Sequence, residues 1–301
     1  MSMQNIWSVQ TEAPALGKLS ERFDIDLVAG AMGARVGGLD VSSLDDEGVS
    51  ELRGLLHQFK AVMLNDQRAD LDVAAYAEFG RRLGPLATDP YVDPIFPEQP
   101  EVMGLVREAN DSAYNFGGDW HSDGSYLEEP GGLTVLWSRD VPPVGGDTLF
   151  SNLELAWHML SPTFKDMLAS RRCIHAATGY GASVDAPKKG DYSPESFAPE
   201  LQRIEAVHPI KRTHPETGAH SLYVNQAYTT QIEGCTPDES AGILKFLFDW
   251  SASPAMTARF SWQPNSILIW DNRNTAHYAI GDYGGHRREM YRLAVTGEKP
   301  V

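Results

Sequence analysis

Residues 267–277 have the sequence Ile-Leu-Ile-Trp-Asp-Asn-Arg-Asn-Thr-Ala-His, and this stretch decides the fold. Its apolar first part has the pattern of a strand buried in a core, and the Asp and Asn residues after it are typical of a turn. His277 follows that turn. The stretch therefore predicts a sheet scaffold that holds one histidine near the end of a core strand.

Further strands and helices are predicted on both sides of this stretch. Strand patterns occur at residues 24–39 (a strand pair), 61–64, 133–138 and 290–296. Helices are predicted at residues 45–59 and 71–83, and after the capping sequences Ser161-Pro162 and Thr236-Pro237-Asp238-Glu239. Strands dominate the middle and the end of the chain. This order predicts an α+β fold in which a two-sheet, jelly-roll barrel is flanked by helices.

The chain shows no break in composition, so residues 1–301 are predicted to form a single domain. Residues 1–20 are predicted to be a loosely packed lead-in. Residues 178–202 are rich in Gly, Pro, Ser and charge, and are predicted to form a mobile loop. Residues 89–100 contain four prolines and predict another loop.

The composition excludes several kinds of partner. A net charge of −16 argues against nucleic acid, because Lys and Arg must neutralise its phosphates, so an anionic ligand must be bound by a few local arginines. No membrane span and no secretory signal are expected, because long apolar runs are missing. Two cysteines, Cys173 and Cys235, are too few for a disulfide framework, which fits a cytoplasmic location. The oligomeric state stays open, and a homo-oligomer is compatible with the sequence.

A second polar stretch, Trp120-His121-Ser122-Asp123, contains the one His-x-Asp doublet of the chain. In an extended segment these side chains project to one face with Cα atoms about 7 Å apart, so they can bind one ion together. With His277 they form a 2-His-1-carboxylate set, which suits divalent iron. The doublet alone is weak, because a chain with nine histidines gives about half a match by chance. A lone distal histidine is, moreover, more often a surface or core residue than a ligand.

Several motifs in a fixed order strengthen this prediction, and together they resemble the taurine dioxygenase and 2,4-dichlorophenoxyacetate dioxygenase family. The motifs are Trp120-His121-Ser122-Asp123, Gly145-Gly146-Asp147-Thr148-Leu149, His214-Pro215-Glu216-Thr217-Gly218, Leu222-Tyr223-Val224-Asn225, Trp270-Asp271-Asn272-Arg273 with His277, and Arg287-Arg288 with Arg292. The resemblance extends from about Leu27 to Pro300. It implies a double-stranded β-helix enzyme that uses Fe(II), 2-oxoglutarate and O2.

Carried over position by position, the resemblance implies that His121, Asp123 and His277 bind the iron. Thr148 and Arg288 match the positions that contact the distal carboxylate of 2-oxoglutarate. The implied reaction is hydroxylation of a small anionic organic substrate, a carboxylate or a sulfonate, with release of succinate and CO2.

Four further positions bear on the substrate. Arg292 matches a position that reaches an anionic group of the substrate in several family members, and residues 288, 290 and 292 of one strand share a face. Asp89 stands in place of a sulfonate-binding His, Tyr228 in place of a Phe, and small residues near Ala177 in place of another Phe. These departures imply a wider pocket and favour an aryloxyalkanoate over taurine. The alternatives are a structural ion pair for Arg292 and a packing role for the other positions.

Competing functions remain open at this point. A taurine dioxygenase proper is the alternative within the same family. A zinc hydrolase can use the same His121, Asp123 and His277 site, but it needs a nearby general base and no arginine for a keto acid. A non-catalytic binding protein on the same fold would have no need of an intact triad.

Overall fold

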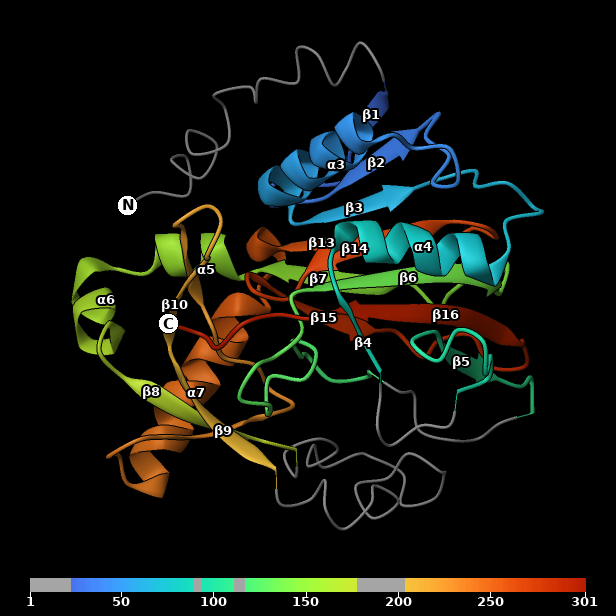
Figure 1. Cartoon of the computed structure of the whole chain (residues 1–301). Helices are drawn as coiled ribbons and strands as arrows, with labels where there is room; N and C mark the ends of the chain where they lie inside the picture. Colours follow the sequence, from blue (N-terminus) through green and yellow to red (C-terminus); the bar gives the residue numbers. More distant parts are fainter. Residues whose placement is uncertain (1–22, 89–93, 111–116, 178–203) are drawn as a thin grey trace.

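The structure, a computed structural model, describes residues 23–88, 94–110, 117–177 and 204–301. The predicted lead-in, the predicted loop at residues 178–202 and Asp89 lie outside the described residues. Within the described ranges, two sheets face each other, and helices pack against the larger sheet and beside the barrel (Figure 1). None of the helices in these ranges is long and apolar enough to cross a membrane.

The larger sheet has eight strands and brings distant parts of the chain together. Its order is β1-β2-β3-β14-β6-β16-β4, and β5 also pairs with β16. The bounds are β1 Asp24–Leu27, β2 Ala34–Gly37, β3 Ala61–Leu64, β4 Leu86–Ala87, β5 Met103–Arg107, β6 Leu133–Asp140, β14 Ile267–Asp271 and β16 Arg288–Val295. The central strand β14 contains the apolar stretch from which the sheet was predicted, and all of its residues are buried.

Two helices, α3 (Asp46–Phe59) and α4 (Val73–Leu83), pack on the larger sheet (Figure 1). Each begins after an aspartate whose side chain accepts a backbone hydrogen bond, Asp45 from the N–H of Gly48 and Asp72 from that of Ala75. Both caps satisfy donors that the first helical turn leaves unpaired. The two helices predicted at residues 45–59 and 71–83 are therefore confirmed, with starts shifted by one and two residues.

The smaller sheet, β13-β7-β15, closes the barrel against the larger one. Its strands are β7 Thr148–Asn152, β13 Thr257–Phe260 and β15 Thr275–Ala279. Phe150 of β7 packs against Phe260 of β13 and Trp270 of β14, with ring centroids 5.5 and 5.4 Å apart. Met290 of β16 belongs to the same core. Because this core joins both sheets, the predicted α+β fold with a jelly-roll barrel is confirmed.

A third group of elements packs beside the barrel (Figure 1). It comprises α5 Leu153–Met159, α6 Pro162–Leu168, α7 Pro237–Ser251, η4 Pro254–Met256, the sheet of β8 Arg172–Ala176, β9 Glu205–Pro209 and β12 Thr229–Ile232, and the hairpin of β10 Lys211–Thr213 and β11 His220–Leu222. The capping box predicted at Thr236 and Glu239 is present at the start of α7. The strands β9 to β12 were not predicted, because they are short and mix polar with apolar residues.

Candidate active site

The backbones of His121 and His277 pair with each other, although the two residues are far apart in the sequence. The N–H of His121 donates to the carbonyl of His277 at 3.0 Å, and the N–H of His277 donates to the carbonyl of His121 at 2.7 Å. His277 belongs to β15, where it is opposite Phe150 of β7. The bridge thus fixes the segment around His121 on the edge of the smaller sheet and brings the imidazole centroids within 4.0 Å.

Asp123 completes a cluster of three side chains of metal-binding type. Its Oδ1 atom lies 3.7 Å from Nε2 of His121 and 3.8 Å from Nε2 of His277. One ligand atom from each residue can be chosen so that all three lie within 4.8 Å of one another. The chain turns at Asp123. His121 lies in the β-bridge and Asp123 lies in the turn that follows it, so the doublet spans the end of an extended segment and the start of a turn.

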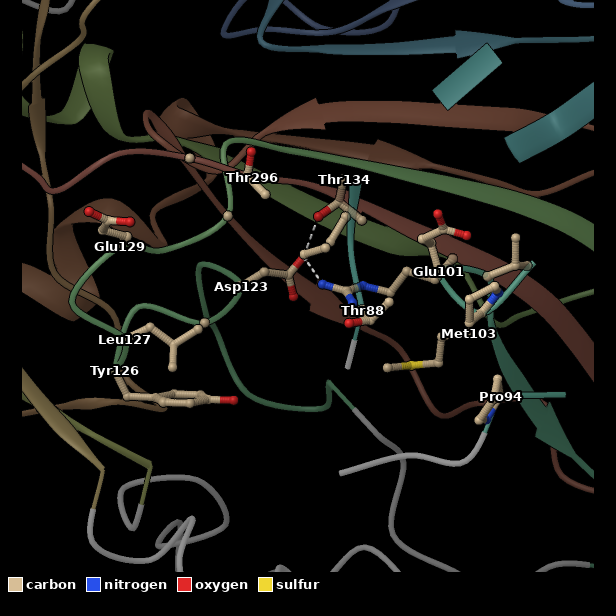
Figure 2. A pocket seen from close by; sticks show the side chains of 18 of the residues that line it. Thr88, Pro94, Glu101, Met103, Asp123, Tyr126, Leu127, Glu129, Thr134 and Thr296 are labelled. Carbon is tan, nitrogen blue, oxygen red and sulfur yellow. Dashed lines mark hydrogen bonds and ion pairs between the residues drawn. The ribbon is translucent and has the colours of Figure 1, made fainter. Parts of the chain in front are cut away.

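The second carboxylate oxygen of Asp123 is held from the larger sheet. Thr134 Oγ1 donates to Oδ2 at 2.6 Å, and Arg292 Nη2 lies 3.1 Å from the same atom (Figure 2). Asn272 accepts from the N–H of Asp123 at 3.3 Å and donates to Thr134 Oγ1 at 2.8 Å. Trp270 Nε1 in turn donates to Asn272 Oδ1 at 2.9 Å. These contacts orient the carboxylate so that Oδ1 faces the imidazoles.

The local electrostatics favour the protonation states that bind a metal. Burial opposes the ionisation of Asp123, but the adjacent Arg292 guanidinium outweighs it and holds the pKa of the carboxyl well below its usual value. Burial and the adjacent His121 lower the pKa of His277 far below its usual value, so this imidazole is neutral. His121 Nδ1 lies 2.7 Å from the carbonyl of Asp119, and a proton on Nδ1 leaves the Nε2 lone pair for a metal. A carboxylate and two neutral imidazoles fit Fe(II).

Thr148 and Arg288 lie on opposite sheets of the barrel and approach each other at Trp262. Thr148 Oγ1 accepts a hydrogen bond from Trp262 Nε1 at 3.1 Å. The Arg288 guanidinium lies 5.9 Å from the centre of the Trp262 ring and 5.8 Å from that of Tyr283. Its Nε is buried and makes no hydrogen bond within the described residues. Burial lowers the pKa of Arg288. A buried cation of this kind is stabilised by an anionic ligand.

A cavity of about 330 Å³ opens beside Asp123, one of the three side chains of metal-binding type (Figure 2). Asp123 and Arg292 both line it. The remaining lining residues are mainly apolar or aromatic, with two glutamates among them: Ala87, Thr88, Pro94, Pro100, Glu101, Val102, Met103, Gly124, Tyr126, Leu127, Glu129, Gly131, Thr134, Tyr228, Ala294, Thr296 and Gly297. The rings of Tyr126 and Tyr228 meet edge to face at 4.9 Å. The cavity thus combines the Arg292 guanidinium with an aromatic wall, next to the side chains of His121, Asp123 and His277.

Some positions that the sequence assigned to the site lie outside the described residues or away from the cavity, and two residues of the site were missed. Asp89 lies outside these residues. Cys173, Ala176 and Ala177 are not among the residues that line the described cavity, and Cys173 belongs to the core beside the barrel. Sequence reasoning missed Thr134 and Asn272. Asn272 belongs to a motif that was noticed, whereas a threonine in a buried strand gives no signal of its own.

The chain is similar to known proteins over most of its length. The family model described as "Taurine catabolism dioxygenase TauD, TfdA family" matches residues 24–294. The chain is 30% identical over 281 residues to an alpha-ketoglutarate-dependent sulfonate dioxygenase of Saccharomyces cerevisiae, a match that covers 90% of this chain and 66% of the yeast protein. It is 27% identical over 288 residues to the (S)-phenoxypropionate/alpha-ketoglutarate-dioxygenase of Sphingobium herbicidovorans, with 93% and 97% covered.

A solved structure with a similar fold is a taurine dioxygenase from Burkholderia xenovorans. The TM-score is 0.79 at 28% sequence identity, and the alignment covers 93% of this chain and 91% of that one. The likeness therefore extends over both sheets of the barrel and the elements beside it.

Proposed function

The chain belongs to the taurine catabolism dioxygenase TauD, TfdA family, and we propose that it hydroxylates a small anionic organic substrate, with aryloxyalkanoates preferred to taurine. It is an Fe(II)- and 2-oxoglutarate-dependent dioxygenase. The observation that carries the substrate proposal is the position of Arg292, which lines a partly aromatic cavity and lies 3.1 Å from Asp123.

In this proposal, His121, Asp123 and His277 bind the iron through Nε2, Oδ1 and Nε2. When bound, Fe(II) with 2-oxoglutarate and O2 supplies the oxidation of a substrate C–H bond to C–OH, with release of succinate and CO2. The residues of the chain bind and orient both organic molecules. This positioning accounts for much of what a protein adds to the chemistry of a cofactor.

Arg288 and Thr148 are assigned to the distal carboxylate of 2-oxoglutarate. A guanidinium matches a carboxylate through two parallel hydrogen bonds, and the Thr148 hydroxyl can donate one more. The buried Nε of Arg288, which has no hydrogen-bond partner among the described residues, supports this assignment. Trp262 and Tyr283 enclose the guanidinium with apolar rings, which strengthens its attraction to an anion by keeping water away.

The walls of the cavity support a substrate with an anionic head and an apolar body. Arg292 supplies the cation, and Tyr126, Tyr228, Met103 and Leu127 supply apolar surface. A volume of about 330 Å³ is at the lower end of the range for small-molecule sites, which suits a single aromatic ring with a short acid side chain. Relatives named for sulfonate and phenoxypropionate substrates support the same chemical class.

The reaction class is tested by anaerobic addition of 2-oxoglutarate to the Fe(II) protein. Chelation of the metal by a 2-oxo acid gives a weak visible charge-transfer band, which a zinc hydrolase would not give. The band should appear with 2-oxoglutarate and be absent in His277→Ala. A protein that binds zinc, gives no band and hydrolyses an ester would contradict the proposal.

The substrate class is tested by succinate release with four matched compounds: taurine, an aryloxyalkanoate, an alkylsulfate and a neutral amide of the aryloxyalkanoate. The aryloxyalkanoate should give a higher kcat/KM than taurine, and the neutral amide should be poor. If taurine gives the highest kcat/KM, the chain is a taurine dioxygenase proper. If the amide gives the highest value, the role of Arg292 in binding an anion is wrong.

A further inference from the structure

Arg107 of β5 lies directly opposite Arg288 of β16 in an antiparallel strand pair. Side chains of directly opposite residues project to the same face, with Cβ atoms about 5 Å apart. That face is the barrel interior, because Leu105 of the same strand packs against the barrel core and Met103 lines the cavity. Val106 points the other way and is exposed. The strand therefore brings a second guanidinium into the barrel beside the first.

Both guanidinium groups are directed at one aromatic ring. The Arg107 guanidinium carbon lies 4.9 Å from the centre of the Tyr283 ring, and that of Arg288 lies 5.8 Å from the same centre. Arg288 also adjoins Trp262, the hydrogen-bond donor to Thr148. Arg107 thus lies next to the end of the barrel where the distal carboxylate of 2-oxoglutarate is placed.

Two like charges opposite each other in a strand pair repel. Burial lowers the pKa of Arg288, and the positive charge of Arg107 acts in the same direction. The neighbouring Arg287 lies in contrasting surroundings, because it forms ion pairs with Glu108, Asp140 and Glu289. Arg288 forms no ion pair with a carboxylate of the described residues. An anionic ligand between the two inner guanidinium groups would relieve their repulsion and compensate the desolvation of Arg288.

We propose that Arg107 is a second binding residue for the distal carboxylate of 2-oxoglutarate, so that Arg107 and Arg288 hold this group between two guanidiniums. The inference rests on the proposed placement of the cosubstrate at Arg288 and Thr148. A carboxylate has two oxygen atoms and can accept hydrogen bonds from both arginines. The pair then fixes the direction of the keto acid and selects against 2-oxo acids that lack a distal carboxylate.

The test compares the affinities of two keto acids that differ at this end. Dissociation constants of 2-oxoglutarate and 2-oxopentanoate are measured for the Mn(II)-loaded protein by calorimetry. Arg107→Gln should weaken 2-oxoglutarate binding by about tenfold or more, and change 2-oxopentanoate binding by less than about twofold. Arg107→Lys, which keeps the charge but not the planar fork, should show a smaller loss for 2-oxoglutarate. Arg287→Gln is the matched control and should leave both constants within about twofold.

A second readout separates binding from packing. The rise in Tm that 2-oxoglutarate produces should shrink in Arg107→Gln and Arg107→Lys, and stay unchanged in Arg287→Gln. An unchanged 2-oxoglutarate affinity in Arg107→Gln, with a loss in Arg288→Gln, overturns the role of Arg107 and leaves the proposed placement intact. An unchanged affinity in Arg288→Gln overturns the placement itself. Equal losses for both keto acids in Arg107→Gln also overturn the inference, because they reflect a general disturbance of the site.

Discussion

Arg292 and Asp123 form an ion pair of 3.1 Å, so the arginine assigned to the substrate also contacts a metal ligand. The contact neutralises a buried carboxylate and holds its Oδ2 away from the imidazoles. The alternatives considered for Arg292, an ion pair and a substrate-binding residue, are therefore compatible, because a guanidinium has several N–H donors. A substrate anion at Arg292 would share the guanidinium with Asp123. Occupation of the cavity and orientation of the metal ligand are thus linked in the proposed site.

Removal of any one proposed metal ligand should nearly abolish Fe(II)-dependent turnover. His121→Ala, Asp123→Ala and His277→Ala each delete one donor of a three-donor set, and two donors bind iron too weakly to hold it. Succinate release measures the loss, and far-UV circular dichroism checks that the fold is intact. Retention of most of the wild-type turnover by any of the three folded variants would disprove the assignment.

Thr134→Val should lower metal affinity by about tenfold or more without changing the ligand set. The hydroxyl of Thr134 donates to Asp123 Oδ2 at 2.6 Å, and valine keeps the shape but not the donor. Equilibrium dialysis with Mn(II) measures the effect. Ser151→Ala is the control, because the Ser151 hydroxyl bonds to the carbonyl of Ser251 away from the metal. Equal affinities in wild type and Thr134→Val would show that this contact does not orient the ligand.

Arg288→Lys should raise the KM for 2-oxoglutarate by at least about tenfold, because an ammonium cannot reproduce the planar, two-point contact of a guanidinium. Thr148→Val should have a smaller effect in the same direction, of about 1–2 kcal/mol for one hydrogen bond to a charged group. Steady-state kinetics at saturating substrate measure both. An unchanged KM in Arg288→Lys would mean that another arginine binds the cosubstrate.

Arg292→Ala should weaken binding of an anionic substrate more than binding of its neutral amide. The variant loses the cation of the cavity but also the partner of Asp123, so the comparison between the two substrates isolates the first effect. Uncoupled decarboxylation of 2-oxoglutarate should persist, since Arg288 is unchanged. The ratio of KM values for acid and amide is the measured quantity. A ratio equal to that of the wild type would assign Arg292 to Asp123 alone.

Acid should destabilise the fold partly through His208. Its Nε2 lies 2.9 Å from the carbonyl of Leu127, and burial lowers its pKa to about 4, with Arg212 and Arg172 acting in the same direction. Its usual pKa is 6.5, so the unfolded chain binds more protons between about pH 6.5 and about pH 4. Stability is therefore lost as the pH falls through this window.

The check on His208 is a comparison of Tm at about pH 7 and about pH 4.5. His208→Asn should reduce the drop in Tm by about 2 °C or more. The exposed His220→Asn serves as the control and should show the same drop as the wild type. A drop in His208→Asn as large as that of the wild type would remove this histidine from the acid response.

The sequence by itself determined the features that depend on near neighbours and on residue type. The cap at Thr236 acts over three residues, so the start of α7 followed from local sequence, and the apolar face of α3 predicted that helix to within one residue of its start. The apolar run of β14 identified a core strand because every residue of a central strand is buried. The types and order of His121, Asp123 and His277 predicted an iron site, and the further motifs in a fixed order strengthened this prediction.

Only the tertiary structure decided which atoms meet in the site. Thr134 and Arg292 reach the same oxygen of Asp123 because β6 and β16 are neighbours in one sheet, and Arg107 lies opposite Arg288 because of the register between β5 and β16. A shift of one residue in either register would turn those side chains to the opposite face. Sheet register is set by packing over the whole barrel, and spacing along the chain therefore does not contain it.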